Sequence, residues 1–349
     1  MKIDYPLLLI ILFLSFSSLY FFYGVSLPYS TKVMNDPLYY FKKFLIFNFL
    51  LPFLLFWLGY FLDWVIFKRI AKILFLINLI FLILPFLDFF KLPNQPTARW
   101  FYFQGFSFQP SEFMKISMLL FLASLLPLIK RKIEYFYISI GLVFLVSLII
   151  YFQPALSNLL IFLAGIIGAL MGSNINLRNI FILFFLVFLL IAFAFLWSYR
   201  SERILGIFKK DERGIGFQLN QSRLAIGSGG ILGKGLGNSE LKSIGLPLML
   251  TDNIFAVYAE ETGFIGSLVL IIIFNFLIFR ILYLAQLVKD ESKRFFAIGV
   301  ACWLSAQVFV HLMSNLLIST GIPLPFFSYG PSSQIAIMIS LGIISKFRN

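Results

Sequence analysis

The sequence predicts an all-α membrane protein with ten transmembrane helices and one large outer loop between helices 7 and 8. Of the 349 residues, 60% are hydrophobic and only 12% are charged, which is more apolar surface than a water-soluble fold can bury. The apolar residues form repeated runs of about 17 to 25 residues, the length that an α-helix needs to cross roughly 30 Å of hydrocarbon. Barrel strands would be about 10 residues long with strict alternation, so we expect helices.

No linker rich in Pro, Gly or Ser divides the chain, so we expect one transmembrane domain over residues 1–349, with the outer loop at 199–253. The first apolar run is too long for a secretory signal peptide and lacks a small-residue cleavage site, so it is predicted to be the first span. The predicted spans are residues 6–27, 43–62, 70–90, 112–129, 136–152, 156–171, 179–198, 254–279, 295–318 and 329–345.

The basic residues orient these spans. With the N-terminus in the cytoplasm, fourteen basic residues lie on the inner side and five lie in or beside the short outer loops, which fits the positive-inside rule. The inner residues are Lys2, Lys68, Arg69, Lys72, Lys130, Arg131, Lys132, Arg178, Arg280, Lys289, Lys293, Arg294, Lys346 and Arg348, and the outer ones are Lys32, Lys42, Lys43, Lys91 and Arg99.

The long outer loop holds further basic residues that the topology does not explain. A basic surface against the outer leaflet suits an anionic ligand such as the pyrophosphate of a lipid carrier, and nucleic acid is not expected as a partner. A solvated loop, whose charges keep it out of the bilayer, fits the composition equally well. These residues are Arg200, Arg203, Lys209, Lys210, Arg213, Arg223, Lys234 and Lys242.

The chain has one cysteine, Cys302, and one histidine, His311, both within apolar runs. One cysteine excludes a disulfide framework and a thiolate metal cluster. One histidine cannot complete a histidine metal site or a catalytic triad, so no metal-ligating residues are predicted. His311 and Gln307 lie on one side of the ninth span, where we expect interhelical hydrogen bonds.

Residues 227–237 of the outer loop read GSGGILGKGLG. Glycine-rich backbone can surround an anion. The segment is not a phosphate loop of the Walker type, because Lys234 is followed by Gly235 and Ser228 holds the first glycine position. It is not a dinucleotide fingerprint either, because Asn238 stands where a third glycine is required. We favour a flexible loop that folds over a substrate, and a series of purely structural turns is the alternative.

Asp252 ends the outer loop and precedes the eighth span. A carboxylate there can cap a helix N-terminus, or it can act as a general base at the mouth of a membrane cavity. The residues alone leave both roles open. Glu260 and Glu261 follow two turns deeper, where an acid is costly and is expected to face a cavity or a partner.

The fourth span also begins with charged residues. Glu112 and Lys115 are three residues apart, so they share one side of a helix and can pair, and Pro110 suits the first helical turn. Just upstream, Arg99 and Trp100 fit either the membrane interface or a contact with the ligand.

Four separated segments together resemble the SEDS family of FtsW, RodA and SpoVE. They read PTARWFYFQGFSFQPSEFMK, GIGFQLNQSRLAIGSGGILGKGLGNS, TDNIFAVYAEETGFIG and TGIPLPFFSYGPSS, at residues 96–115, 214–239, 251–266 and 320–333. Their order, their spacing and the ten-span layout also match, so the resemblance extends over nearly the whole chain. Details of the loops favour an FtsW-type over a RodA-type protein.

The resemblance implies a peptidoglycan glycosyltransferase that polymerises lipid II in septal or lateral cell-wall synthesis, with Asp252 as the general base that deprotonates the acceptor sugar. The reaction would be inverting and would expel undecaprenyl pyrophosphate. The cations expected nearest the leaving group are Lys115, Arg203 and Lys234, with Glu112 orienting Lys115. The other residues expected at the substrate are Gln218, Gln221, Ser222 and Arg99.

The resemblance also implies the surroundings of the protein. It predicts a multi-pass protein of the bacterial inner membrane with cytoplasmic termini and a periplasmic catalytic face. The expected partners are lipid II, the growing glycan strand, a class B penicillin-binding transpeptidase and membrane proteins of the divisome or elongasome. No cofactor is required by the motifs, although a divalent ion, Mg or Mn, is a candidate helper at the pyrophosphate.

Several positions depart from the pattern of the family. His311 stands at the glycine of Asn-Ile-Gly, Pro331 stands at the second glycine of Ser-Tyr-Gly-Gly, and the acid of Gln-Pro-Asp is Ala155; Leu248 and Leu250 replace the acid of Leu-Pro-Glu and the histidine of His-Thr-Asp. These changes keep two other functions open, a lipid II flippase or transporter and a non-catalytic scaffold for the transpeptidase. A flippase needs charged groups through the depth of the bilayer, whereas the charges here concentrate at the outer end.

Overall fold

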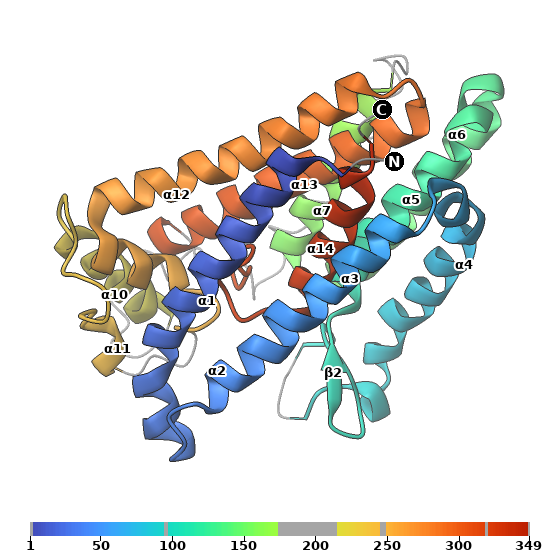
Figure 1. The fold of residues 1–349 in the computed structure, drawn as a ribbon. Coiled ribbons are helices and arrows are strands. Elements are labelled where there is room, and N and C mark those ends of the chain that lie inside the picture. Colours follow the sequence, from blue (N-terminus) through green and yellow to red (C-terminus); the bar gives the residue numbers. More distant parts are fainter. Residues whose placement is uncertain (1–2, 94–96, 174–214, 245–248, 318–319, 348–349) are drawn as a thin grey trace.

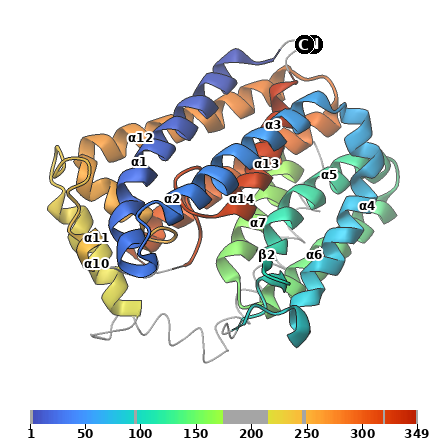
Figure 2. The same cartoon turned by 60° about the horizontal axis from the view of Figure 1, so that its bottom comes forward.

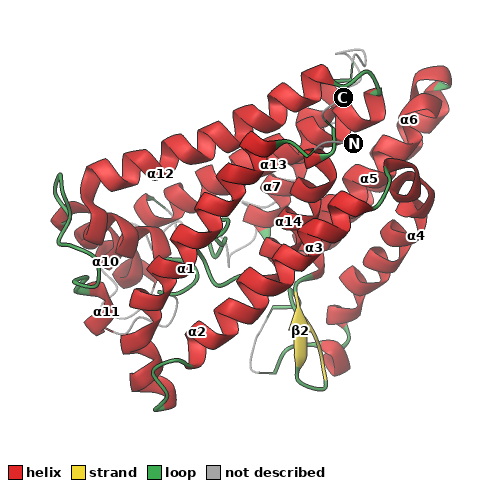
Figure 3. Cartoon of the chain, viewed as in Figure 1, coloured by secondary structure: helices red, strands yellow, loops and turns green. Residues whose placement is uncertain are grey.

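The computed structural model describes residues 3–93, 97–173, 215–244, 249–317 and 320–347. Helices dominate it, which confirms the predicted all-α membrane fold (Figures 1 and 3). Its α-helices are α1 Tyr5–Met34, α2 Tyr39–Phe44, α3 Leu51–Phe61, α4 Trp64–Ile83, α5 Pro110–Arg131, α6 Ile133–Phe152, α7 Leu156–Met171, α10 Ile215–Ser228, α11 Leu241–Ile244, α12 Ile254–Leu287, α13 Glu291–Leu316 and α14 Pro331–Ser345.

Most of the predicted spans coincide with these helices. Within the described residues, seven helical segments are long and apolar enough to cross a membrane, and they coincide with seven of the predicted spans. The predicted sixth and tenth spans coincide with the shorter apolar helices α7 and α14. The predicted seventh span, 179–198, lies outside the described residues.

The helices extend past the ends of their apolar runs. Helix α1 continues to Met34, where Asn35 adopts a left-handed conformation (φ 53°) and ends it, and α12 continues to Leu287. Hydropathy locates the hydrocarbon and does not locate the helix end, because a polar turn remains helical in the interface. The second span contains a π-helical turn at Leu45–Leu50 between α2 and α3, and two 3₁₀ turns, Leu84–Phe86 and Asp88–Phe90, follow α4.

A β-hairpin precedes α5, and the all-α prediction did not include it. Strand β1, Phe101–Phe103, pairs antiparallel with β2, Phe106–Phe108. The turn between them places Gln104 and Gly105 at positive φ (47° and 86°), as a tight two-residue hairpin turn requires. The aromatic residues on the strands read as part of an apolar run, which concealed the hairpin.

Helix α5 lies at the centre of the bundle. In its most apolar stretch, 72% of the residues of α5 are buried, against 22% for the span that contains α4. Helix α5 therefore packs against other helices on all sides, whereas most of α4 lies on the outside of the bundle, where a membrane protein meets lipid. Helices α4, α6, α7, α13 and α14 all contact α5. The central position of α5 brings the polar residues of its first turn into the interior.

The two chain termini lie together at one end of the bundle, and α10, α11 and the hairpin lie at the other, which we call the loop end (Figures 1 and 2). At the terminal end, the backbone N–H of Asp4 donates to the carbonyl of Ser345 (3.0 Å). The buried Asp4 carboxylate also accepts from the Arg280 guanidinium at 2.9 and 2.5 Å. These contacts join α1, α12 and α14 where the chain begins and ends.

Candidate functional site at the loop end

Asp252 lies at the loop end in the turn that leads into α12. The N-cap position of α12 belongs to Asn253, so Asp252 stands one residue ahead of the cap. Its side chain is half-buried, and its main-chain carbonyl accepts a hydrogen bond from the Asn315 amide at 3.0 Å. A Cβ built on Gly321 would lie 3.6 Å from Asp252 Oδ2, so the backbone of the segment before α14 passes beside the carboxylate.

A stripe of polar side chains on α13 holds this arrangement. Trp303, Gln307, His311 and Asn315 recur every four residues, so they share one face of the helix, and all four are fully buried. The Gln307 amide accepts from Trp303 Nε1 (2.9 Å) and donates to the carbonyl of Pro323 (3.0 Å) and to Ser333 Oγ in α14 (2.8 Å). The stripe therefore ties α13 to α14 and to the segment that precedes it, which confirms the hydrogen bonding expected of Gln307.

The π-helical turn contributes a further contact to the same segment. Asn48 is buried there, and its amide donates to the carbonyl of Ser328 at 2.9 Å. The Ser328 hydroxyl in turn donates to the carbonyl of Thr251 (2.6 Å), and the N–H of Tyr329 donates to the carbonyl of Leu250 (2.9 Å). The carbonyls of residues 250–252 are thus held by the segment before α14 on one side and by Asn315 on the other.

Glu112 and Lys115 form the ion pair that their spacing predicts. Lys115 Nζ lies 2.8 Å from Glu112 Oε2, and both side chains are at most 2% exposed. The Lys115 ammonium also lies 5.0 Å from the centre of the Trp303 ring, within the range of a cation–π contact. A fully buried pair of charges in a membrane helix is costly and marks a functional or architectural site.

The α13 stripe leads from this ion pair towards Asp252. Trp303 contacts Lys115 and Asn315 contacts Asp252. The two stripe residues are separated by twelve positions, which is about 18 Å along a helix with a rise of 1.5 Å per residue. Lys115 therefore contacts α13 deeper in the bundle than the end that holds Asp252, and the buried polar residues of the stripe lie between these two contacts.

Lys234 in the glycine-rich loop is paired with two acids. Its ammonium lies 2.8 Å from Glu260 Oε1 and 3.0 Å from Glu240 Oε1. Hydrogen bonds to Glu260 and then to Glu240 raise the pKa of Lys234 above its ordinary value. The Glu260 carboxylate also accepts from Ser239 Oγ and from the backbone N–H of Glu240 (3.1 Å), so it organises the whole turn.

The glycines let this loop lie directly on α12. The N–H groups of Lys234 and Gly235 donate to the carbonyls of Glu260 and Glu261, both at 3.0 Å. Those carbonyls are accessible because α12 is kinked at Gly263 (φ 68°). A Cβ on Gly233 would lie 2.2 Å from the Glu261 carbonyl oxygen, so no larger residue fits. For residues 229–240 the structure shows a series of turns docked on α12, and a role of this loop in covering a substrate stays a prediction.

Residues Gln218, Gln221 and Ser222 all lie on α10. Gln218 and Gln221 are half-buried, whereas Ser222 is buried and donates to the Gln218 carbonyl of its own helix at 3.1 Å. Arg223 Nε donates to the carbonyl of Leu316 at the end of α13 (2.7 Å). An apolar cavity of about 350 Å³ lies beside this contact between α10, α12 and α13, and its lining includes Ile226, Phe255, Phe264, Leu268 and Leu316.

Arg99 is half-buried and directed at backbone carbonyls. Its guanidinium donates to the carbonyl of Gln153 (3.2 Å) and to that of Pro154, at the turn between α6 and α7. This contact fixes the start of the hairpin segment against the bundle. Arg203, the other predicted cation, lies outside the described residues.

Within the described chain, no three His, Cys, Asp or Glu side chains are grouped to hold a metal ion. A divalent helper ion therefore stays a prediction. Sequence reasoning missed Trp303 and Asn315, although one signal for them was present. Both continue the four-residue spacing of Gln307 and His311 through an otherwise apolar run, and such spacing indicates a buried polar face.

Comparison with known proteins gives consistent matches over nearly the whole length. The cell cycle protein family of FtsW, RodA and SpoVE matches residues 5–349. The chain is 32% identical over 340 residues to a protein of Haemophilus influenzae named probable peptidoglycan glycosyltransferase FtsW, covering 93% of this chain and 84% of the relative. It is 30% identical over 351 residues to stage V sporulation protein E of Bacillus subtilis, covering 98% and 95%.

Two solved structures share the fold. One is described as "Structural coordination of polymerization and crosslinking by a peptidoglycan synthase complex" and matches with a TM-score of 0.74 and 25% identity, covering 99% of this chain and 97% of the other. The rod shape determining protein RodA of Thermus thermophilus matches with a TM-score of 0.68 and 26% identity, covering 99% and 96%.

Proposed function

The chain belongs to the FtsW, RodA and SpoVE family, and from that premise we propose that it is a peptidoglycan glycosyltransferase that polymerises lipid II. Relatives that share about 30% of its residues carry that activity in their names. The multi-pass helical bundle matches solved structures of the family over 99% of the chain. An FtsW-type role in cell division agrees with the relatives named FtsW.

The single observation that carries the mechanism is the placement of Asp252. It is a half-buried carboxylate at the loop end, one residue ahead of the α12 cap position; the backbone at Gly321 passes beside it, and the Asn315 side chain holds its main-chain carbonyl. A carboxylate so placed can accept a proton from a sugar hydroxyl that approaches from the membrane surface.

In the reaction that we propose, Asp252 takes the proton from the 4-hydroxyl of the acceptor GlcNAc. The oxygen then forms a bond to the anomeric carbon of the donor while the bond from that carbon to the pyrophosphate breaks. The anomeric carbon is inverted, and undecaprenyl pyrophosphate leaves with the electron pair. Because Asp252 is partly surrounded by protein, its carboxylate interacts more strongly than it would in water with the positive charge that develops on the attacking hydroxyl.

The leaving pyrophosphate needs cations, and the predicted set is Lys115, Arg203 and Lys234. Lys234 is paired with Glu260 and Glu240, and Lys115 is paired with Glu112 below the level of Asp252. We propose that Lys115 acts through the α13 stripe and that Arg203 is the candidate for direct contact. Mg²⁺ or Mn²⁺ would supply further charge at the pyrophosphate, but no described cluster of ligands fits a resident ion, so no step is assigned to it.

We place the loop end at the periplasmic face of the bacterial inner membrane and both termini in the cytoplasm. The shared end of the two termini (Figures 1 and 2) and the inner excess of basic residues support this orientation. A class B penicillin-binding transpeptidase is the proposed partner, because a neighbour in fold is described as part of a complex that couples polymerization and crosslinking.

The decisive experiment gives labelled lipid II to the purified protein with and without its transpeptidase, and separates the products by size. Glycan chains that disappear with Asp252→Asn support the polymerase. Movement of lipid II across vesicle membranes without any polymer would contradict the polymerase function and support the flippase function. If a folded protein bound to its transpeptidase shows neither activity, the result would support the non-catalytic scaffold function.

A further inference from the structure

Asn315 holds the backbone of Asp252. Its Nδ2 donates to the Asp252 carbonyl (3.0 Å) and to the carbonyl of His311 (3.0 Å), and the side chain is fully buried at the end of α13. Both partners are carbonyl oxygens, which only accept, so the amide orientation is fixed with its nitrogen towards Asp252. The position of Asp252 is thus coupled to a rigid helix.

His311 holds the other backbone segment that meets Asp252. Its Nδ1 lies 2.6 Å from the carbonyl of Ile322. A carbonyl only accepts, so the ring proton sits on Nδ1 and Nε2 is the accepting nitrogen. Nε2 lies 3.4 Å from Asn315 Nδ2, so this tautomer places an unprotonated nitrogen, and not a second N–H, beside that amide group.

Ile322 follows the residue that faces the carboxylate. Gly321 has a positive φ of 71°, and its missing Cβ would stand 3.6 Å from Asp252 Oδ2. Any shift of the Ile322 carbonyl therefore moves the wall that faces the Asp252 side chain. His311 and Asn315, one helical turn apart, control the two backbone segments that define where that carboxylate lies.

We propose that Asn315 and His311 are positioning residues for Asp252, a role that rests on the proposed function. Asn315 fixes the main chain of the acid, and His311 fixes the backbone wall beside its carboxylate. Neither side chain is assigned a contact with substrate. Polar groups inside a membrane bundle are costly unless they are used, and both of these side chains are fully buried and hydrogen-bonded to backbone beside Asp252.

The test compares Asn315→Leu, His311→Leu and His311→Asn with the parent protein, in complex with its transpeptidase. Leucine has the branched shape of asparagine and about the size of histidine but cannot form the hydrogen bonds, whereas asparagine at 311 restores a donor near the position of Nδ1. A misplacement of about 1 Å can cost a factor of about 100 in rate. We therefore expect the leucine variants to lower kcat about 10- to 100-fold with little change in KM, and His311→Asn to recover most of it.

A second readout does not depend on activity. Hydrogen exchange followed by mass spectrometry should show faster exchange at residues 249–253 in Asn315→Leu and at residues 320–324 in His311→Leu, with α5 unchanged. Ser340→Ala is the matched control, because Ser340 is also fully buried and donates only within its own helix, to the Ala336 carbonyl at 2.8 Å. It should change neither readout.

The outcomes separate the two claims. Unchanged kcat, unchanged local exchange, or faster exchange spread equally to α5 would each overturn the positioning role. A parent protein that makes no polymer would overturn the proposed function, while the exchange data still decide whether Asn315 and His311 hold the segments around Asp252.

Discussion

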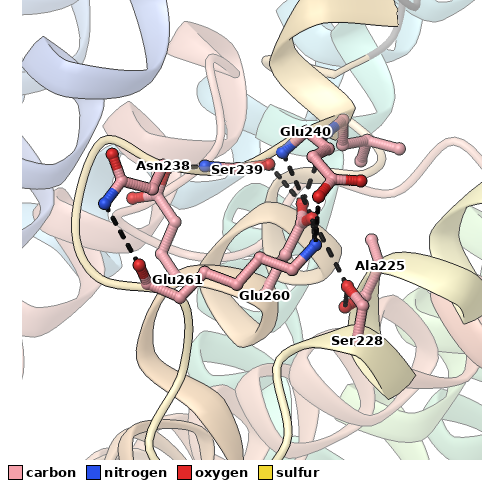
Figure 4. Close-up of polar contacts among 9 residues, drawn as sticks. Ala225, Ser228, Asn238, Ser239, Glu240, Glu260 and Glu261 are labelled. Atoms are coloured by element: carbon pink, nitrogen blue, oxygen red, sulfur yellow. Dashed lines mark hydrogen bonds and ion pairs between the residues drawn. The ribbon is translucent and has the colours of Figure 1, made fainter.

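Lys234 Nζ lies 2.8 Å from Glu260 Oε1, and this contact joins the glycine-rich loop to α12 three residues before the kink at Gly263. Glu260 is almost completely buried and also accepts from Ser239 and Glu240 (Figure 4). The loop is therefore a docked part of the loop end, held by this carboxylate together with backbone hydrogen bonds to α12. That carboxylate belongs to the same helix that Asp252 precedes, so loop and acid share one support.

Glu260→Gln should release the loop while the bundle stays folded. The neutral amide loses the charge that strengthens its hydrogen bonds, which are worth roughly 1.5–3 kcal/mol each when one partner is ionised. We expect limited proteolysis and hydrogen exchange to accelerate at residues 229–241. The matched control is Glu240→Gln, because Glu240 also pairs with Lys234 but its side chain is 80% exposed. Equal loosening in both variants would contradict the central role of Glu260.

The pH dependence of this contact follows from the raised pKa of Lys234. A group whose pKa is higher in the folded state stabilises it fully below the unfolded value, which is about 10.4 for lysine, and loses that contribution only as the pH rises through the folded value. Protection of residues 229–241, corrected for intrinsic exchange, should therefore stay constant from about pH 7 to about pH 9. A loss of protection within that range would show that Lys234 does not hold the loop.

Gly263→Ala should destabilise the loop end. The residue has φ 68°, and an added Cβ would lie 2.3 Å from the Gly233 nitrogen and 2.6 Å from the Ile231 carbonyl oxygen. Strain of this kind costs on the order of 1–3 kcal/mol, before any steric clash. Thermal unfolding in detergent should show the loss. Gly141→Ala in α6 is the control, since its Cβ would meet nothing within 4 Å, and the better helix former should gain about 0.5–1 kcal/mol.

The buried ion pair allows a test that separates architecture from chemistry. Lys115→Met leaves Glu112 charged and uncompensated, which typically costs about 3–5 kcal/mol. Adding Glu112→Gln removes the stranded charge, so the double variant should regain most of the stability. We expect it to fold and to polymerise lipid II at least about 10-fold more slowly, because the α13 stripe loses its contact with Lys115 at Trp303 and the site at its other end is displaced. A stable double variant with full activity would make the pair purely architectural.

Asp252→Asn should abolish polymerisation with little change in stability. The amide keeps the shape of the side chain and cannot accept the proton, a loss of about 100- to 10,000-fold for a general base. Asp36→Asn is the matched control at the same end of the bundle, where Asp36 is also half-buried but is paired with Lys42. Comparable activity of the Asp252 variant and the parent protein would remove Asp252 from the mechanism.

Much of the fold was predictable because hydropathy reports burial in lipid directly. Nine predicted spans coincide with helices in the part of the chain that the structure describes. The Glu112–Lys115 pair was also predictable, because a three-residue spacing on a helix brings two side chains together whatever the tertiary fold. The hairpin at Phe101–Phe108 was missed, because its aromatic strands have the composition of the neighbouring spans.

The contacts of the site were less predictable. The sequence indicated Lys234 as a cation for an anionic ligand. In the structure Lys234 is paired with Glu260, because the loop docks on α12 beside the kink at Gly263. Arg99 looked like an interface residue, and the structure directs it to the carbonyls that end α6. In both cases the partner comes from a distant segment whose approach no local pattern encodes.

The sequence by itself determined the membrane class, the positions of the spans, the family and the acid at the loop end, because each depends on composition or on residues close together in the chain. Only the tertiary structure showed that the basic side chains of Lys115 and Lys234 form ion pairs with acidic residues of this chain. It also showed that α13 supports Asp252 through Asn315. The physical reason is that a buried polar group must find a partner wherever the packing of distant helices places one.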